Sequence, residues 1–131
     1  MDWQGALRAR LIAAPPVAAL VAQRIYWVDR PQASALPAIT LQTIFDGRPQ
    51  HMSGLVGLDQ ANVQIDVWGT SYSQVTQITE AVIAALLPAQ TGNGTVFQRA
   101  FIDSITDRGE RVETQFIHRT QIDFIIHHAN A

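Results

Sequence analysis

Alternating hydrophobic and polar residues mark two strands in the first half of the chain. In residues 61–68, alanine, valine and isoleucine alternate with asparagine, glutamine and aspartate. Residues 38–45 alternate in the same way, and the pattern places three apolar side chains on one face, namely Ile39, Leu41 and Phe45. A period of two is typical of a strand with one buried face. Both segments are therefore predicted to be half-buried strands.

Three further segments are predicted to be strands. The short segment 24–28 is rich in β-branched and aromatic residues. The segments 95–105 and 112–127 are longer and have a similar composition. The charged segment 106–110 between the two long runs is predicted to be a turn. In the last strand, one predicted face carries Phe116, Ile122, Phe124 and Ile126, and the other carries Arg119, Gln121 and Asp123.

A helical period appears in three segments. Residues 2–13 repeat apolar side chains every four positions behind Asp2, a plausible N-cap, and a short helix over 17–23 follows two prolines. Residues 71–87 form the strongest amphipathic pattern, and Pro88 ends it. Ser71 followed three residues later by Gln74 predicts a capping box.

The order of these elements predicts an α+β fold with a mostly antiparallel β-sheet and helices packed on one face. We expect one domain over residues 1–131, since the length suits one compact unit. The second face of the sheet would be rich in glutamine, asparagine, threonine, aspartate and arginine, and so open to solvent or to a neighbouring subunit. Residues 46–57 are predicted to be a long connection, or a protruding hairpin if the flanking strands extend.

Composition removes several classes of function. The formal net charge is −2 and all nine basic residues are arginine, which argues against a dedicated nucleic-acid-binding module. The chain has no cysteine, so disulfides, thiolate metal sites and cysteine nucleophiles are excluded. It has neither a recognisable signal peptide nor an apolar run long enough to span a membrane. We therefore expect a product of the cytoplasm that makes no membrane contact.

The candidate catalytic groups do not form a convincing site. His127 and His128 are adjacent in a strand and point to opposite faces, and His118 differs from His127 in parity, so a shared metal ion is not expected. His51 lies near Ser53, but no nucleophile-elbow sequence surrounds them. The acidic residues of 103–113 are most simply a solvated hairpin tip. We therefore predict no catalytic residue, no cofactor and no metal.

The three tryptophans divide into two groups. Trp3 and Trp27 lie in or beside predicted elements and are expected to pack in the core. Trp68 shares the parity of Asn62, Gln64 and Asp66, on the polar face of its strand. Tryptophan and arginine are enriched where binding energy is concentrated. Trp68 is therefore the best candidate for an interface anchor.

A series of segments, taken together, resembles the tail-completion (tail terminator) proteins of long-tailed phages and of gene transfer agents. No single segment is a sharp motif, and the resemblance rests on their order over nearly the whole chain. The segments are MDWQGALRARL (1–11), RIYW (24–27), PAITL (37–41), QIDVWG (64–69), the helix around Tyr72 and 80–86, and HRTQIDF (118–124).

This resemblance implies a structural role and no catalysis. Such proteins form a homohexameric ring on the head-proximal end of the tail tube, where the ring stops tube polymerisation and meets the head connector or stopper protein. DNA would pass through the ring without sequence-specific binding. The protein would be made in the cytoplasm of the producing bacterium and end in the virion or gene-transfer-agent particle, at the head–tail junction.

Two regions are expected to make the contacts with other subunits or with the tube. One is the 46–57 segment, and the other is the polar sheet face; the candidate residues are Arg48, His51, Met52, Gln64, Asp66, Trp68, Arg119 and Gln121. Composition alone leaves alternatives open. A head-completion or stopper ring is the first, and a small enzyme or a nucleic-acid-binding module is less favoured.

Overall fold

The computed structural model describes residues 2–30, 35–48, 50–51, 54–55 and 57–130, with 50–51 and 54–55 described as backbone only. Helices and strands follow in the order α1 (Trp3–Ala13), α2 (Pro15–Val21), β1 (Ile25–Trp27), β2 (Ala38–Gly47), β3 (Gln50–His51), β4 (Gly54–Leu55), β5 (Asp59–Gly69), α3 (Tyr72–Leu86), β6 (Gln90–Gly92), β7 (Thr95–Phe97), β8 (Phe101–Val112) and β9 (Gln115–Asn130).

One seven-stranded sheet organises the chain. Its order is β1-β2-β5-β9-β7-β6, and β8 pairs with β9 beside β7. Strand β1 runs parallel to β2, whereas the other pairs in this sheet are antiparallel. The predicted α+β fold with a mostly antiparallel sheet is thus confirmed. Strand β8 has only β9 as a partner among the described residues, so its outer edge is open.

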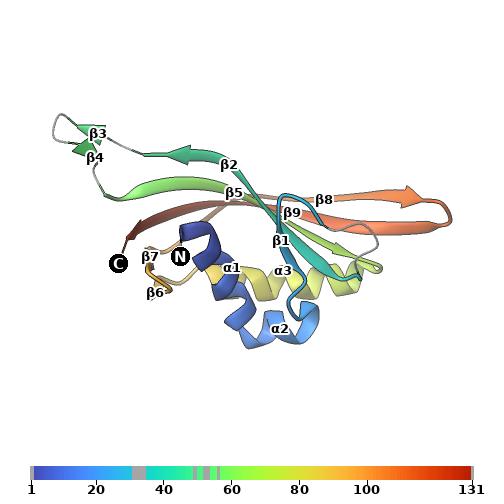
Figure 1. The fold of residues 1–131 in the computed structure, drawn as a ribbon. Helices are drawn as coiled ribbons and strands as arrows, with labels where there is room; N and C mark the ends of the chain where they lie inside the picture. Colours follow the sequence, from blue (N-terminus) through green and yellow to red (C-terminus); the bar gives the residue numbers. More distant parts are fainter. Residues whose placement is uncertain (1, 31–34, 49, 52–53, 56, 131) are drawn as a thin grey trace.

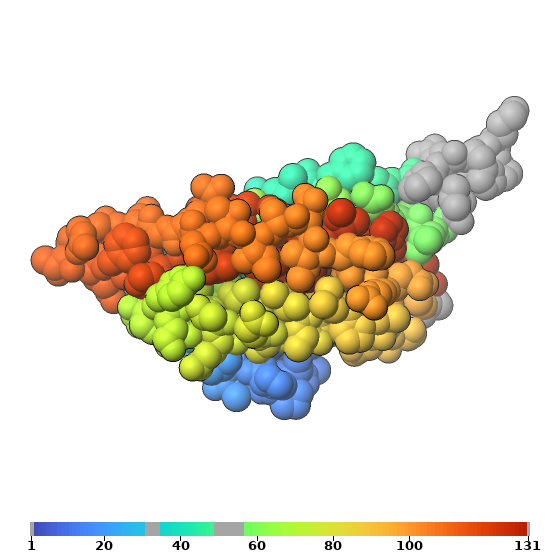
Figure 2. All heavy atoms as spheres, turned by 180° about the vertical axis from the view of Figure 1, so that it is seen from behind, coloured from blue at the N-terminus to red at the C-terminus, as the bar shows by residue number. Residues whose placement is uncertain are grey.

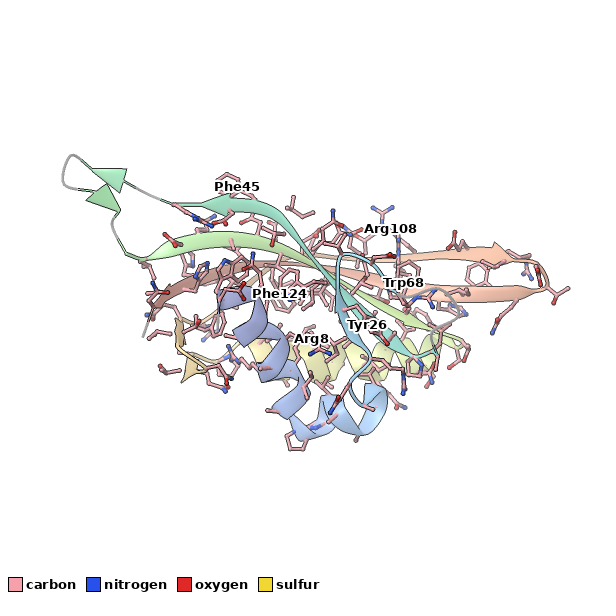
Figure 3. All side chains as sticks on the ribbon, in the orientation of Figure 1. Arg8, Tyr26, Phe45, Trp68, Arg108 and Phe124 are labelled. Carbon is pink, nitrogen blue, oxygen red and sulfur yellow. The ribbon has the colours of Figure 1, made fainter. Side chains whose placement is uncertain are left out.

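The helices cover one face of the sheet and leave the other uncovered (Figure 1). The core lies between these two layers, and its side chains come from alternate positions of β2, β5 and β9 and from the inner faces of the helices. Among the largest fully buried side chains are Leu7, Leu11, Ile39, Leu41, Ile65, Ile78, Ile122 and Phe124. Figure 3 places Phe124 between the sheet and the helices. The predicted periodicities of 2–13, 61–68 and 71–87 supply most of this core.

Helices α1 and α3 begin at the predicted caps. The Asp2 carboxylate accepts a hydrogen bond from the Gly5 amide at 2.7 Å, and the Ser71 hydroxyl accepts one from the Gln74 amide at 3.2 Å. The reciprocal bond differs from a capping box, because the Gln74 side chain accepts from the amide of Thr70 and not from that of Ser71. Both helix starts therefore have a side-chain acceptor for their free amides.

Strands extend beyond the helical layer at both ends of the sheet (Figure 1). At one end, β8 and β9 continue as a two-stranded arm past the N-terminus of α3. At the other end, β2 and β5 lead to the small β3–β4 pair. The 46–57 segment therefore follows the hairpin alternative, since β2 extends to Gly47 and β5 begins at Asp59.

The C-terminal strands differ from the prediction in two places. The predicted strand 95–105 is two strands, because β7 pairs with the end of β9 whereas β8 pairs with its earlier part. Ala100, in the step between them, is buried and donates its amide to the Leu87 carbonyl at 3.0 Å. The predicted turn at 106–110 is wrong, since these residues belong to β8 and the turn is at Glu113 and Thr114. Charged side chains are tolerated in this strand because both sides of the arm meet solvent.

Candidate subunit interface

The uncovered face of the sheet is built from cross-strand rows of side chains. Strands β2, β5, β9 and β8 lie side by side, so residues paired across them point to the same side. One row holds Thr40, Asp66, Gln121 and Thr106, and the next holds Ala38, Trp68, Arg119 and Arg108. Figure 3 shows Arg108 on the side of the sheet away from the helices. Four of the predicted interface residues thus come from two adjacent rows.

A hydrogen-bonded network of amides and carboxylates occupies the centre of this face. The Gln64 amide donates to Asp66 Oδ2 at 2.9 Å, and the Gln121 amide lies 3.3 Å from both oxygens of Asp123. Arg108 Nε donates to Gln121 Oε1 at 2.9 Å. Each link joins side chains that share the uncovered face. The network therefore fixes the orientation of Gln64 and Gln121 before any partner binds.

Asp66 is an exception in this network because one of its carboxylate oxygens has no partner. The side chain is only 6% exposed, and Oδ1 is buried without a hydrogen bond. Burial raises the pKa of this carboxyl, and the hydrogen bond from Gln64 only partly opposes the shift. A buried acceptor without a donor is uncommon in folded proteins. Asp66 Oδ1 is therefore a buried acceptor whose hydrogen-bonding capacity is unused within the described residues.

Trp68 is held in place by an arginine pair and a threonine. The guanidinium carbons of Arg119 and Arg30 lie 5.0 Å and 5.4 Å from its ring centroid. Its Nε1–H donates to Thr40 Oγ1 at 3.0 Å. The ring is half-buried and cation–π contacts of this kind are attractive. Trp68 therefore has the fixed, partly exposed aromatic surface that interface anchors commonly have.

The remaining predicted residues lie away from this cluster. Arg48 forms an exposed ion pair with Asp46 at 2.9 Å and lines a hollow with Trp3 and His128 at the opposite end of the sheet. His51 is in β3, where only its backbone is described, and Met52 lies outside the described residues. The structure therefore brings together Gln64, Asp66, Trp68, Arg119 and Gln121, and it does not bring Arg48 to them.

Sequence reasoning missed an apolar zone on the same face. Phe45 was predicted to share the buried face of Ile39 and Leu41, but it pairs with Asn62 and is 53% exposed. The cause is a β-bulge between Thr43 and Phe45, which reverses the parity of the strand. Ile44, inside the bulge, is also exposed. Two consecutive apolar residues at the end of an alternating strand were the available signal.

Phe101 completes the apolar zone. It pairs with Ile125, which pairs with Asn62, so Phe45, Asn62, Ile125 and Phe101 form one row across the sheet. Phe101 is exposed, and Figure 3 shows Phe45 pointing away from the helices. The uncovered face therefore has an apolar end, a polar centre and an end built from Trp68 and arginines.

His127 and His128 pack against aromatic rings. His128 is buried and stacks on Trp3 with ring centroids 4.5 Å apart, whereas His127, on the other face, contacts Phe101. Burial lowers the pKa of His128. The described residues contain no group of three or more histidine or acidic side chains placed to hold a metal ion. Within the same residues, no helix is long and apolar enough to cross a membrane.

The other two tryptophans lie where the sequence predicted. Trp3 and Trp27 pack against the core and meet edge to face, with ring centroids 5.9 Å apart. The Trp27 indole N–H donates to the Gln4 carbonyl at 3.0 Å. These contacts join α1 to the edge strand β1. Trp68 is thus the tryptophan that remains on the uncovered face.

Comparison with known proteins gives a consistent match. Residues 5–127 match the model of a family described as "Tail completion protein gp17". The chain also resembles a chain in a solved structure of the virion of a native gene transfer agent particle, with a TM-score of 0.73 and 20% sequence identity. That alignment covers 97% of this chain and 94% of the other. A search of curated proteins finds no match to this sequence.

Proposed function

Since the chain belongs to the tail completion protein gp17 family, we propose that it is a tail terminator, a structural protein that ends the growth of a tail tube. In this proposal, six copies form a ring on the head-proximal end of the tube and join it to the head connector or stopper protein. The family match over residues 5–127 is the observation that carries the proposal. The fold shared with a chain from a gene transfer agent virion supports it.

The proposed mechanism is geometric. One side of the ring makes the contacts that an incoming tube subunit would make, and the other side offers no site for a further tube subunit. Contacts between unlike surfaces of neighbouring copies close the ring, so growth ends there. No bond is formed or broken, and no catalytic residue is required. DNA passes through the ring, and the net charge of −2 gives no reason to expect strong or sequence-specific binding.

The uncovered sheet face is the surface that we assign to contacts with other subunits or with the tube. It carries the half-exposed ring of Trp68, the arginines around it and the unpartnered oxygen of Asp66. Tryptophan and arginine are the residue types among these that concentrate binding energy in protein interfaces. The network around Gln64 and Gln121 holds the polar groups in fixed orientations, which reduces the entropy lost on binding.

The test is electron microscopy of particles from producing cells that lack this gene. If the proposal is right, tails will be overlong and uneven in length, and they will be detached from filled heads, because tube growth is no longer stopped. A copy of the gene supplied in trans should restore tails of normal length. Intact particles from the deletion strain would reject a structural role in the tail.

A second candidate function is a head-completion or stopper ring of the neck. It predicts a different result in the same experiment. Tails would then have their normal uniform length but would fail to join heads. The family description favours the tail assignment, because it names completion of the tail.

A further inference from the structure

Large exposed hydrophobic side chains gather in two separate places on this molecule. The first, which we call the face patch, is the apolar end of the uncovered face and consists of Ile44, Phe45 and Phe101. The second, which we call the arm patch, lies on the helix side of the β8–β9 arm and consists of Tyr72, Ile105, Arg111, Phe116 and His118. The two patches are on opposite faces of the sheet, and Arg111 and Phe116 of the arm patch lie toward the β8–β9 turn.

The arm patch is a continuous aromatic surface. The Phe116 ring contacts His118 with centroids 4.8 Å apart, and the His118 ring lies 6.2 Å from that of Tyr72. Phe116 also lies over Gly109, where an added Cβ would come within 2.5 Å of the ring. Figure 2 shows the arm extending beyond α3, so this surface is not covered by the helices. An aromatic surface this exposed marks a site of protein contact.

The hollow beside the face patch is acidic, whereas the arm patch holds charges of both signs. Its carboxylate, Asp107, is already engaged, because it accepts a hydrogen bond from the Tyr72 hydroxyl at 3.0 Å. The face patch borders a hollow of about 270 Å³ whose lining includes Asp103 and Asp123 and no basic residue. The arm patch carries Arg111, whose guanidinium carbon lies 5.8 Å from the Phe116 ring centroid. Among the described residues, neither Asp103 nor Arg111 takes part in an ion pair. Both patches are therefore apolar, and the Arg111 guanidinium of one has the sign of charge that suits the acidic hollow of the other.

We propose that the partner of the face patch is the arm patch of a second copy of this chain. Arg111 of one copy enters the acidic hollow beside Asp103 of the next, and Phe116 packs on Ile44 and Phe45. Because the two surfaces differ and lie on opposite faces, each copy can bind one neighbour through each patch. Such a contact is heterologous and closes into a ring when the rotation between copies allows it. This inference rests on the ring of the proposed function and names the residues that join its subunits.

The test is a charge exchange in the purified full chain, with assembly followed by sedimentation velocity over a range of concentrations. The unchanged chain should form a closed oligomer. Asp103→Arg or Arg111→Asp alone should weaken association by roughly tenfold to a hundredfold, because like charges then face each other. Both side chains are exposed, so neither change should unfold the chain. Arg99→Asp, an exposed change outside both patches, is the matched control and should assemble normally.

Two combinations provide the decisive readout. The double variant restores opposite charges at every contact and should recover assembly. An equimolar mixture of the two single variants should also recover it, because copies that alternate around a ring with an even number of subunits meet only opposite charges. Single variants that assemble normally would overturn the proposal. So would failure of both combinations, or an unchanged chain that stays monomeric at every concentration.

This result can be separated from the gene-deletion experiment. If the deletion gives overlong tails but the single variants assemble normally, the terminator function stands and the patch contact is wrong. If the charge exchange behaves as expected but tails keep their length without the gene, the contact stands and the terminator function is wrong.

Discussion

At the scale of single residues, Asp66 lies in an environment that disfavours its charge. Its carboxylate is buried, and one oxygen has neither a hydrogen bond nor contact with water. Burial raises its folded-state pKa above the unfolded value, so the ionised form costs stability at pH values above that folded pKa. This loss of stability disappears as the pH falls through the folded pKa, because Asp66 then becomes protonated and neutral. The charge of Asp66 therefore lowers the stability of the free subunit at neutral pH.

Asp66→Asn should therefore raise the free energy of unfolding of the free chain at pH 7 by about 1 kcal/mol. The advantage over the unchanged chain should shrink as the pH falls, since Asp66 itself then becomes neutral. Urea unfolding at several pH values measures both effects. Asp103→Asn, an exposed change on the same face, is the control and should alter stability by less than about 0.5 kcal/mol. A variant that is less stable than the unchanged chain at pH 7 would contradict this account.

At the scale of elements, the structure depends on how α1 is joined to the end of α3. Arg10 of α1 is buried, donates to the Pro88 carbonyl after α3, and places its guanidinium 5.6 Å from the centroid of the Phe97 ring in β7. Burial lowers the pKa of this guanidinium, whose Nε has no hydrogen-bond partner. One side chain therefore connects three elements that are distant in sequence.

Arg10→Ala should lower the free energy of unfolding by about 3 kcal/mol, because it removes a charge-assisted hydrogen bond, a cation–π contact and buried packing. Chemical denaturation measures the loss. The free energy of unfolding of Arg10→Lys should lie between those of the unchanged chain and of Arg10→Ala, since an ammonium group lacks the planar donor geometry of guanidinium. Arg99→Ala serves as the exposed control. An Arg10→Ala chain as stable as that control would show that this junction is not needed.

Strong periodicity made most elements predictable, and tertiary pairing decided the rest. Helix α3 and strand β5 were predicted closely, because each has a regular apolar face that packs in the core. The break between β7 and β8 was missed, since both segments have strand composition and the break comes from a change of position along β9. The face of Phe45 was missed because the bulge after Thr43 reverses the alternation, and its signal in the sequence is only the pair of apolar residues Ile44 and Phe45.

The same contrast applies to the candidate interface. Alternation predicted that Gln64 and Asp66 share a face of β5 and that Arg119 and Gln121 share a face of β9, whereas their closeness comes from the register of the two strands. Arg48 was predicted to be an interface residue because it lies in the 46–57 segment. The structure places it at the other end of the sheet from the polar cluster. The position of a residue within a strand indicates which face of the sheet its side chain occupies. Whether residues of two strands lie near each other depends on the register in which the strands pair.

At the scale of the whole molecule, the helices stabilise only the middle of a long sheet. The arm beyond α3 has no core of its own, and its side chains from 105 to 116 are all exposed. Regions with few buried apolar contacts open at low free energy. The free subunit is therefore expected to be least stable in the arm, which is also where the arm patch lies.

Hydrogen exchange should show this difference directly. Backbone amides of 108–118 should exchange much faster in the free chain than those of 61–67 in the central strand β5, and they should slow when copies assemble. The amides of β5 should change little and provide the internal control. Arm amides that are as protected as those of β5 before assembly would show that the arm is rigid without a neighbour.

The open outer edge of β8 has a consequence for the time before assembly. An unpaired strand edge can seed the stacking of chains into fibres, a hazard for a protein that accumulates while it awaits its particle. Here the edge strand carries Asp103, Asp107, Arg108, Glu110 and Arg111, and charges spaced in this way oppose backbone pairing with another chain. The charged edge of β8 therefore disfavours stacking of free chains edge to edge.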